Sequence, residues 1–141
     1  MIISSLPYTA INDTSNYADN YDPVTTASPS CTTSTFGNYY HGGNDVIYSY
    51  TAQESGIIKD ELACVVGWTG LFIYTNCENI GVSYDACATS TTAGNSIIND
   101  FAVTAGQTYY FYVSSWPAPQ TFAYTFNVTQ LPLGVDGMAK K

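Results

Sequence analysis

Oxygen-bearing side chains gather in the first third of this 141-residue sequence. Carboxylates and carboxamides suit calcium, which takes roughly six to eight hard oxygen ligands. The candidate ligands are Asn12, Asp13, Asp19, Asp22 and Asp45, with Asn16 and Asn44 close to them in the chain. These residues predict a structural calcium ion, Ca2+, that would fix the segment around it. The alternative is that the same side chains serve in Asx turns and helix caps.

Aromatic residues in loops are the second kind of site residue. Sugars present apolar C–H faces and a ring of hydroxyls, so their sites combine exposed rings with polar side chains. Trp116 lies in SSWPAPQ, where two prolines stiffen the backbone, and a ring that is already ordered costs little entropy on binding. Trp68 in VVGWTG and the pair Tyr39 and Tyr40 are the other candidates for ligand binding. The alternative is that both indoles cap the ends of the fold.

Residues for catalysis are scarce. His41 is the only histidine, no arginine is present, and the NYYHGG segment around His41 contains no nucleophile motif. Glu54, Glu61 and Glu78 show no spacing that singles out a pair of catalytic carboxylates. The sequence therefore predicts that the protein is not an enzyme.

Four cysteines, without a CxxC pair, favour disulfides over a zinc or thioredoxin-like site. Cys77 and Cys87 flank a short polar segment and are expected to close a loop, which leaves Cys31 to pair with Cys64. The alternative is four buried free thiols. Disulfides would indicate an oxidising compartment.

The candidate site residues must be positioned by the strands of the fold. In the first of two aromatic segments Tyr109, Phe111 and Val113 alternate with Tyr110 and Tyr112, so both faces bear rings. The second segment places apolar side chains at period two, at Phe122, Tyr124, Phe126 and Val128. This period is typical of a strand with one buried face.

Further strand candidates, separated by Gly, Asn and Pro turns, are residues 2–9, 45–52, 57–66, 71–76, 84–89 and 97–103. Residues 12–43 have no periodicity and are expected to form a long loop. About seven to nine short strands without a helical period predict an all-β fold, an antiparallel β-sandwich of jelly-roll type. Residues 1–130 are expected to form one domain, and 131–141 have the composition of a tail or linker.

The net charge of −8 excludes some partners. The only cations are Lys59, Lys140 and Lys141, so nucleic acid and anionic membrane surfaces are disfavoured. No apolar stretch approaches the roughly 20 residues of a membrane span, and the first residues lack the features of a signal peptide. A low charged fraction of 10% suits a secreted or cell-surface β-domain, expected to be part of a larger protein.

Several segments resemble a known family. The order SLPYT, NDVIYSYTA, GWTGLFIYTNC, a further cysteine, TAGQTYYFYV and AYTFNVT is similar to the bacterial pre-peptidase C-terminal (PPC) domain over residues 3–129. More closely, the chain resembles the version found in large secreted or surface proteins of Bacteroidetes-type bacteria. The resemblance implies a jelly-roll-like β-sandwich outside the cell that serves as an accessory domain.

Some relatives bind calcium through an acidic N-terminal segment and acidic residues just before one strand. Asp45 matches the strand-entry position, and Asn12 and Asp13 resemble the N-terminal contribution. Gly42 stands where those relatives carry a second carboxylate.

Residues and resemblance together predict a non-catalytic accessory or binding domain of a larger secreted or surface protein. Its expected target is an extracellular polysaccharide or a fibrous protein, and neighbouring domains of the parent protein are further partners. The alternative is a structural spacer or adhesin repeat with no small ligand.

Overall fold

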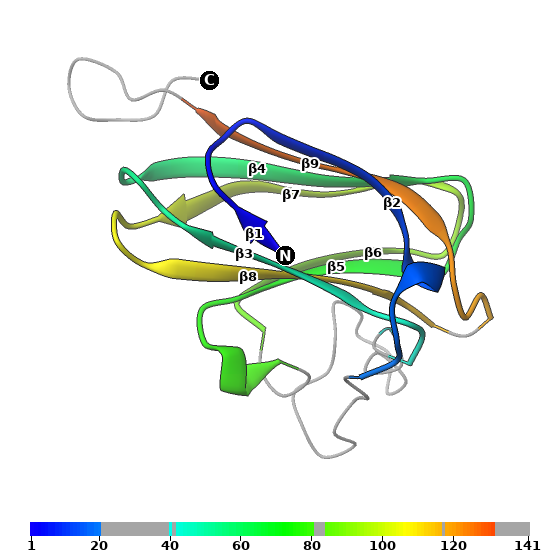
Figure 1. The fold of residues 1–141 in the computed structure, drawn as a ribbon. Helices are drawn as coiled ribbons and strands as arrows, with labels where there is room; N and C mark the ends of the chain where they lie inside the picture. The colour runs from blue at the N-terminus through cyan, green and yellow to red at the C-terminus, as the bar shows by residue number, and fades with distance from the viewer. Residues whose placement is uncertain (21–39, 41, 81–83, 117, 132–141) are drawn as a thin grey trace.

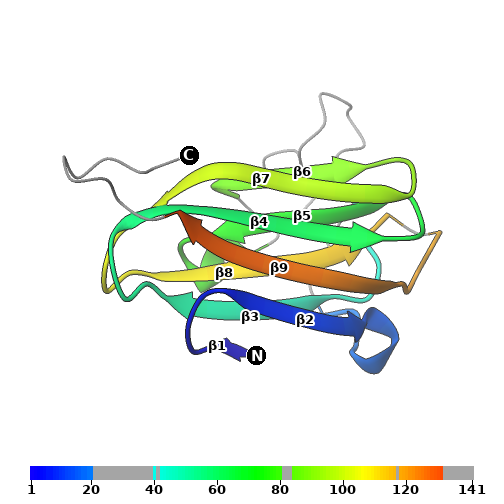
Figure 2. The same cartoon turned by 90° about the horizontal axis from the view of Figure 1, so that it is seen from above.

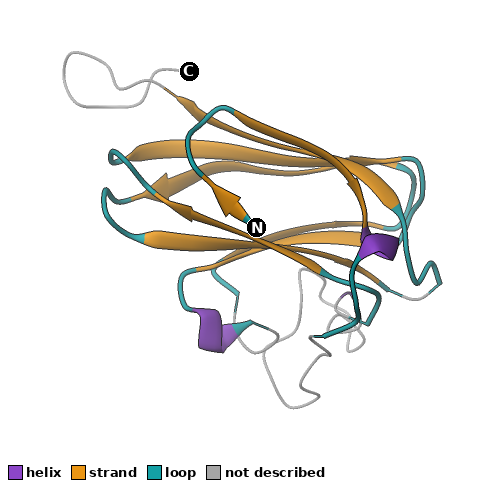
Figure 3. Ribbon diagram, viewed as in Figure 1, coloured by secondary structure: helices purple, strands orange, loops and turns teal. Residues whose placement is uncertain are grey.

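In the part of the chain that the structure describes, nine strands form two facing sheets (Figure 1; Figure 2 from above). The computed structural model describes residues 1–20, 40, 42–80, 84–116 and 118–131. The strands are β1 (Ile2–Ile3), β2 (Tyr8–Asp13), β3 (Val46–Thr51), β4 (Gly56–Cys64), β5 (Thr69–Tyr74), β6 (Ala86–Ser90), β7 (Gly94–Val103), β8 (Thr108–Ser115) and β9 (Ala123–Leu131). Within these residues two short 3-10 helices, η1 (Thr14–Asn16) and η3 (Cys77–Asn79), lie in connections between strands (Figure 3).

The strand order confirms the predicted all-β antiparallel sandwich. One sheet has five strands in the order β1-β3-β8-β5-β6, and the other has four in the order β2-β9-β4-β7. Every neighbouring pair is antiparallel except β1 and β3, which are parallel. No helix in the described part of the chain is long and apolar enough to cross a membrane.

The N-terminal segment differs from the prediction. The single strand expected over residues 2–9 is two strands, β1 and β2, which belong to different sheets. Pro7 lies between them and has no N–H to donate to a ladder. The loop expected to start at residue 12 starts later, because β2 continues to Asp13 along β9 and η1 follows it.

Alternating side chains fill the space between the sheets. Tyr109, Phe111 and Val113 of β8 point inward, as predicted, and pack with inward residues of β3 and β9. The hydroxyls of Tyr48 and Tyr124 lie 2.7 Å apart in this core and satisfy each other. The many tyrosines therefore contribute both apolar area and an internal hydrogen bond.

The five-stranded sheet is covered on its outer face as well. A second cluster there contains Phe72 and Tyr74 of β5, Tyr112 of β8, and the connecting residues Tyr40 and Ile80. All six residues of β5 are consequently buried, which explains its continuous apolar run. The prediction that both faces of β8 carry rings is confirmed, and the rings of Tyr109, Phe111 and Tyr112 are buried.

One carboxyl group lies in the core. Asp60 of β4 has no exposed surface, and its two carboxyl oxygens have no hydrogen-bond partner in the structure. It shares the inward face of β4 with Ile58 and Leu62. Burial raises the pKa of Asp60 to about 8, against a small lowering by its own backbone N–H, so the group is largely protonated at neutral pH.

Candidate functional site

A row of three aromatic side chains lies at the end of the sandwich where β4 leads into β5 and β8 ends. The rings of Trp68 and Trp116 have centroids 5.3 Å apart at an interplanar angle of 78°. Trp116 also meets Tyr40 edge to face, at 5.4 Å and 77°. We call Trp68, Trp116 and Tyr40 the aromatic row.

The pairing of β5 with β8 brings the two indoles together. In this ladder Thr69 lies opposite Ser115, so the residues just beyond, Trp68 and Trp116, are also opposite each other. The Trp116 N–H donates to the Trp68 carbonyl at 2.8 Å, and the Trp68 N–H donates to the Ser90 carbonyl at 2.7 Å. The backbone N–H and carbonyl of Trp68 are thus both hydrogen-bonded, one to Ser90 and the other to Trp116.

Trp68 adopts a backbone conformation that few side chains adopt. Its φ is 62°, in the left-handed region, which costs an ordinary residue roughly 1–2 kcal/mol. The two backbone hydrogen bonds and the contact with Trp116 offset this cost. Strained residues that the surroundings hold in place cluster at functional sites.

The three rings differ in exposure. Trp68 is 41% exposed, Trp116 is half-buried, and Tyr40 is 1% exposed. Trp68 therefore presents its ring to solvent, while Trp116 supports it and Tyr40 supports Trp116 from below. The alternative that both indoles merely cap the sandwich describes Trp116 better than Trp68. Tyr39, the fourth ligand-binding candidate, lies outside the described residues.

Hydrogen bonds fix the segment that carries Trp116. The N–H groups of Gly43 and Asn44 donate to the carbonyls of Ser115 and Gln120, at 2.8 and 2.9 Å. The Gln120 side chain donates to Asn44 Oδ1 at 3.0 Å. A side chain at Gly43 would overlap Ser115, so this close approach requires glycine.

The segment around Thr91 and Thr92 lies beside the exposed indole's loop. Gly67, beside Trp68, packs against the backbone of Thr91 and Thr92 so closely that a Cβ atom would not fit. Thr91 and Thr92 are exposed, and their backbone borders the Trp68 loop. An exposed ring next to hydroxyls can stack on an apolar surface and hydrogen-bond at its edge.

The calcium candidates separate into two groups. Asp45, at the entry to β3, lies close to the N-terminal segment: its Oδ2 accepts from the Asn20 N–H at 2.9 Å, and its N–H donates to the Ala18 carbonyl at 3.1 Å. The Tyr112 hydroxyl donates to Asp45 Oδ2 at 3.5 Å, and burial, followed by the charges of Asp45 and Asp19, raises the pKa of Tyr112. A cavity of about 210 Å³ adjoins Asp45.

The other candidates are used in local structure. Asn12 donates to the Tyr17 hydroxyl at 2.7 Å and accepts from the Asp13 N–H at 2.9 Å. Asp13 caps η1 by accepting from the Ser15 N–H at 2.8 Å. These contacts match the Asx-turn alternative. Asp22 lies outside the described residues. Within the described residues, no three or more His, Cys, Asp or Glu side chains are grouped so that they could hold a metal ion.

Both predicted disulfides are wrong. Cys64 and Cys77 are free thiols. Cys87 is disulfide-bonded, but not to Cys77. Cys87 lies in β6 opposite Phe72 of β5, whereas Cys77 lies outside this ladder, in η3, and is exposed to solvent. Cys31 lies outside the described residues. Burial raises the pKa of the Cys64 thiol, and its contact with the Thr69 hydroxyl lowers it by less.

The fold is similar to that of a PPC domain. No protein-family model matches the sequence, and no curated protein matches it. The pre-peptidase C-terminal domain of a collagenase from Bacillus anthracis aligns with 91% of this chain and 92% of its own length, at 14% identity and a TM-score of 0.55. The likeness confirms the resemblance at the level of the fold.

Two more distant structures also align. The mitogen from Yersinia pseudotuberculosis covers 70% of this chain and 96% of its own, at 14% identity and a TM-score of 0.37. CBM35 from Cellvibrio japonicus Abf62 covers 86% of this chain and 93% of its own length, at 16% identity and a TM-score of 0.41.

Proposed function

We propose that this protein is a non-catalytic, extracellular accessory domain that binds a polysaccharide through Trp68. The observation that carries the proposal is the 41% exposed indole on a backbone held by hydrogen bonds on both sides. A sugar that stacks on this ring would not have to order it first, which saves free energy on binding. Thr91 and Thr92 would supply hydroxyls at the edge.

A non-catalytic role fits the polar groups that the structure describes. Glu61 lies 4.0 Å from Lys59 on the open face of the four-stranded sheet, and Glu78 is exposed in η3. Asp60 is enclosed in the core, where no substrate reaches it. His41 lies outside the described residues.

A pull-down on insoluble polysaccharides and on collagen fibrils tests the proposal. Trp68→Ala should abolish retention on the polysaccharide that the wild type binds. The matched control is Val65→Ala in the same loop, which is 85% exposed and apolar but carries no ring. Retention that Trp68→Ala leaves intact would reject the proposed site, and retention on collagen alone would redirect the proposal to a fibrous protein.

We also propose a structural calcium ion near Asp45. Asp45 and Asn20, which line the cavity of about 210 Å³, would supply a carboxylate and an amide oxygen, and Asp19, next to Asn20 in the chain, would supply a second carboxylate. These groups fit the hard-oxygen chemistry of calcium but are fewer than a complete ligand set, so water or further chain oxygens would complete it. The ion would tie the N-terminal segment to the start of β3.

Melting curves in chelator and in millimolar calcium test this ion. A ligand that binds only the folded state at 100 times its Kd adds about 2.7 kcal/mol to the free energy of unfolding. Asp45→Asn should remove the shift, whereas Asp13→Asn should keep it, because asparagine also caps a helix. Equal melting temperatures with and without calcium would exclude the site. A calcium shift without retention on any polysaccharide or fibril would favour the structural spacer instead.

A further inference from the structure

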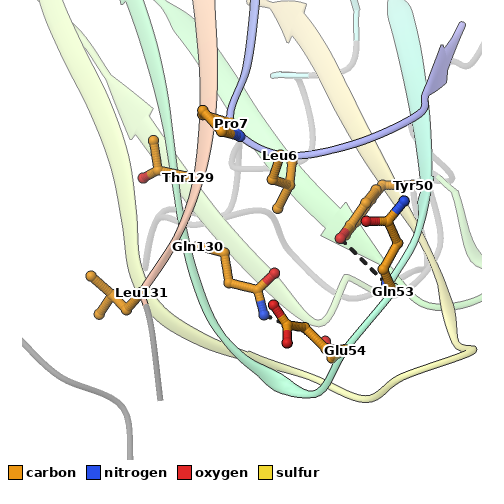
Figure 4. Close-up of a pocket in the computed structure, with 8 residues that line it drawn as sticks. All are labelled: Leu6, Pro7, Tyr50, Gln53, Glu54, Thr129, Gln130 and Leu131. Carbon is orange, nitrogen blue, oxygen red and sulfur yellow. Dashed lines mark hydrogen bonds between the residues drawn. The ribbon is translucent and has the colours of Figure 1, made fainter. Parts of the chain in front are cut away.

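A second pocket lies at the end of the sandwich opposite the aromatic row. It has a volume of about 410 Å³ and forms between the β1–β2 connection, the β3–β4 turn and the end of β9 (Figure 4). This volume lies in the range of pockets that hold small ligands, roughly 300–1,000 Å³. The sequence offers no motif for it, because its residues come from three distant segments.

The polar side of the pocket carries the amides of Gln53 and Gln130 and the Glu54 carboxylate, beside the hydroxyls of Tyr50 and Thr129. The Gln130 side-chain N–H2 donates to the Glu54 backbone carbonyl at 3.4 Å, and that of Gln53 donates to the Ser4 carbonyl at 3.0 Å. One N–H of each amide is therefore bonded to a backbone carbonyl, and the side-chain oxygens can accept hydrogen bonds from a ligand. Figure 4 shows Gln130 next to Glu54, with Gln53 across the pocket.

The Glu54 carboxylate adds a negative charge that is not compensated. Glu54 is exposed, and its side chain makes no hydrogen bond or ion pair within the described ranges. Lys59, the only lysine in those ranges, lies beside Glu61 on the outer face of β4. With a net charge of −8, the whole protein also attracts cations.

The remaining side of the pocket is apolar. Leu6 and Pro7 contribute from the β1–β2 connection, and Leu131 contributes from the end of β9 (Figure 4). A ligand that suits both sides carries a cationic hydrogen-bond donor at the end of a hydrocarbon stem. The lysine side chain has this structure, with three donors on an ammonium group and four methylenes behind it.

We propose that this pocket binds a lysine side chain of a partner protein, with the ammonium group at Glu54 and the stem against Leu6 and Leu131. The amide oxygens of Gln53 and Gln130 would accept from the ammonium protons that Glu54 leaves unbonded. The domain would then contact a protein at one end and a polysaccharide at the other. The pocket does not depend on the aromatic row, so either proposal can fail without the other.

Amide chemical shifts of the full chain, labelled with ¹⁵N, test the proposal. Titration with Nα-acetyl-lysine methylamide should shift the amides of Gln53, Glu54 and Gln130. Nα-acetyl-norleucine methylamide has a similar stem without the ammonium group and should leave them unchanged at the same concentration. Glu54→Gln should weaken binding of the lysine derivative by about fivefold, the upper range for a solvent-accessible ion pair.

Glu78→Gln is the matched control, since Glu78 is an exposed glutamate in η3 outside the pocket lining. It should leave the affinity unchanged. The amide spectrum of each variant shows whether the fold is intact. Equal shifts with both derivatives, an affinity that Glu54→Gln does not change, or shifts confined to other residues would each overturn the proposal.

Discussion

The buried carboxyl of Asp60 should make the domain lose stability as the pH rises. Its pKa is about 8 in the fold, against an ordinary value of 3.8. Between these values the folded chain keeps a proton that the unfolded chain has released, so unfolding releases one proton. The free energy of unfolding then falls by about 1.4 kcal/mol per pH unit.

The magnitude is large for a small domain. Over a window of about four pH units the loss amounts to roughly 6 kcal/mol, against a typical total stability of roughly 5–15 kcal/mol. The contribution of Asp60 is most favourable below about pH 4, where both states are protonated, and levels off above about pH 8, where both are ionised. Only its own backbone N–H favours the ionised form, and neither carboxyl oxygen has a hydrogen-bond partner among the residues that the structure describes.

Asp60→Asn isolates this effect, because it keeps the shape of the side chain and removes the ionisable group. Urea unfolding followed by tryptophan fluorescence, from about pH 5 to about pH 8, gives the free energy of unfolding of each protein. As the pH rises, the free energy of unfolding of the variant should increase relative to that of the wild type by about 1.4 kcal/mol per pH unit. Glu61→Gln, at the next position of β4 and not buried in the core, is the control and should not change the slope. Parallel curves for wild type and Asp60→Asn would refute the reasoning.

Two further predictions concern the core and the thiols. Tyr48→Phe should cost about 1–3 kcal/mol, because the buried Tyr124 hydroxyl loses its 2.7 Å partner, and adding Tyr124→Phe should recover part of this loss in chemical denaturation. Alkylation of the unreduced native protein, followed by peptide mass spectrometry, should modify Cys77 rapidly and the half-buried Cys64 slowly. A Cys77 that resists alkylation would contradict its assignment as a free thiol.

The fold could be predicted largely because alternation decides which face of a strand is buried. Tyr109, Phe111 and Val113 point inward as their period of two required. The extent of β2 could not be predicted in this way, because its polar residues Asn12 and Asp13 suit turns. Pairing with β9 overrides that local preference.

The sites depend on contacts between distant residues. Trp68 and Trp116 were each candidates, but their contact follows from the register of β5 against β8, which no local pattern shows. The prediction of a Cys77–Cys87 disulfide failed for the same reason, because residues close in the chain need not be close in space, and the Cys31–Cys64 pair inferred from it by elimination failed with it. The burial of Asp60, by contrast, could have been read from the sequence. Asp60 lies two residues from both Ile58 and Leu62, so it points to the same face of β4 as these apolar side chains, while Lys59 and Glu61 point to the other face.

The opposite placement of Trp68 and the end of β9 has a practical consequence. β9 ends at Leu131, at the end of the sandwich farthest from the aromatic row (Figure 1). Attachment to a bead, a sensor chip or a fused reporter through the residues after Leu131 would orient the indole away from the support. The domain could therefore be immobilised in one defined orientation, and no long linker would be needed to keep the indole accessible.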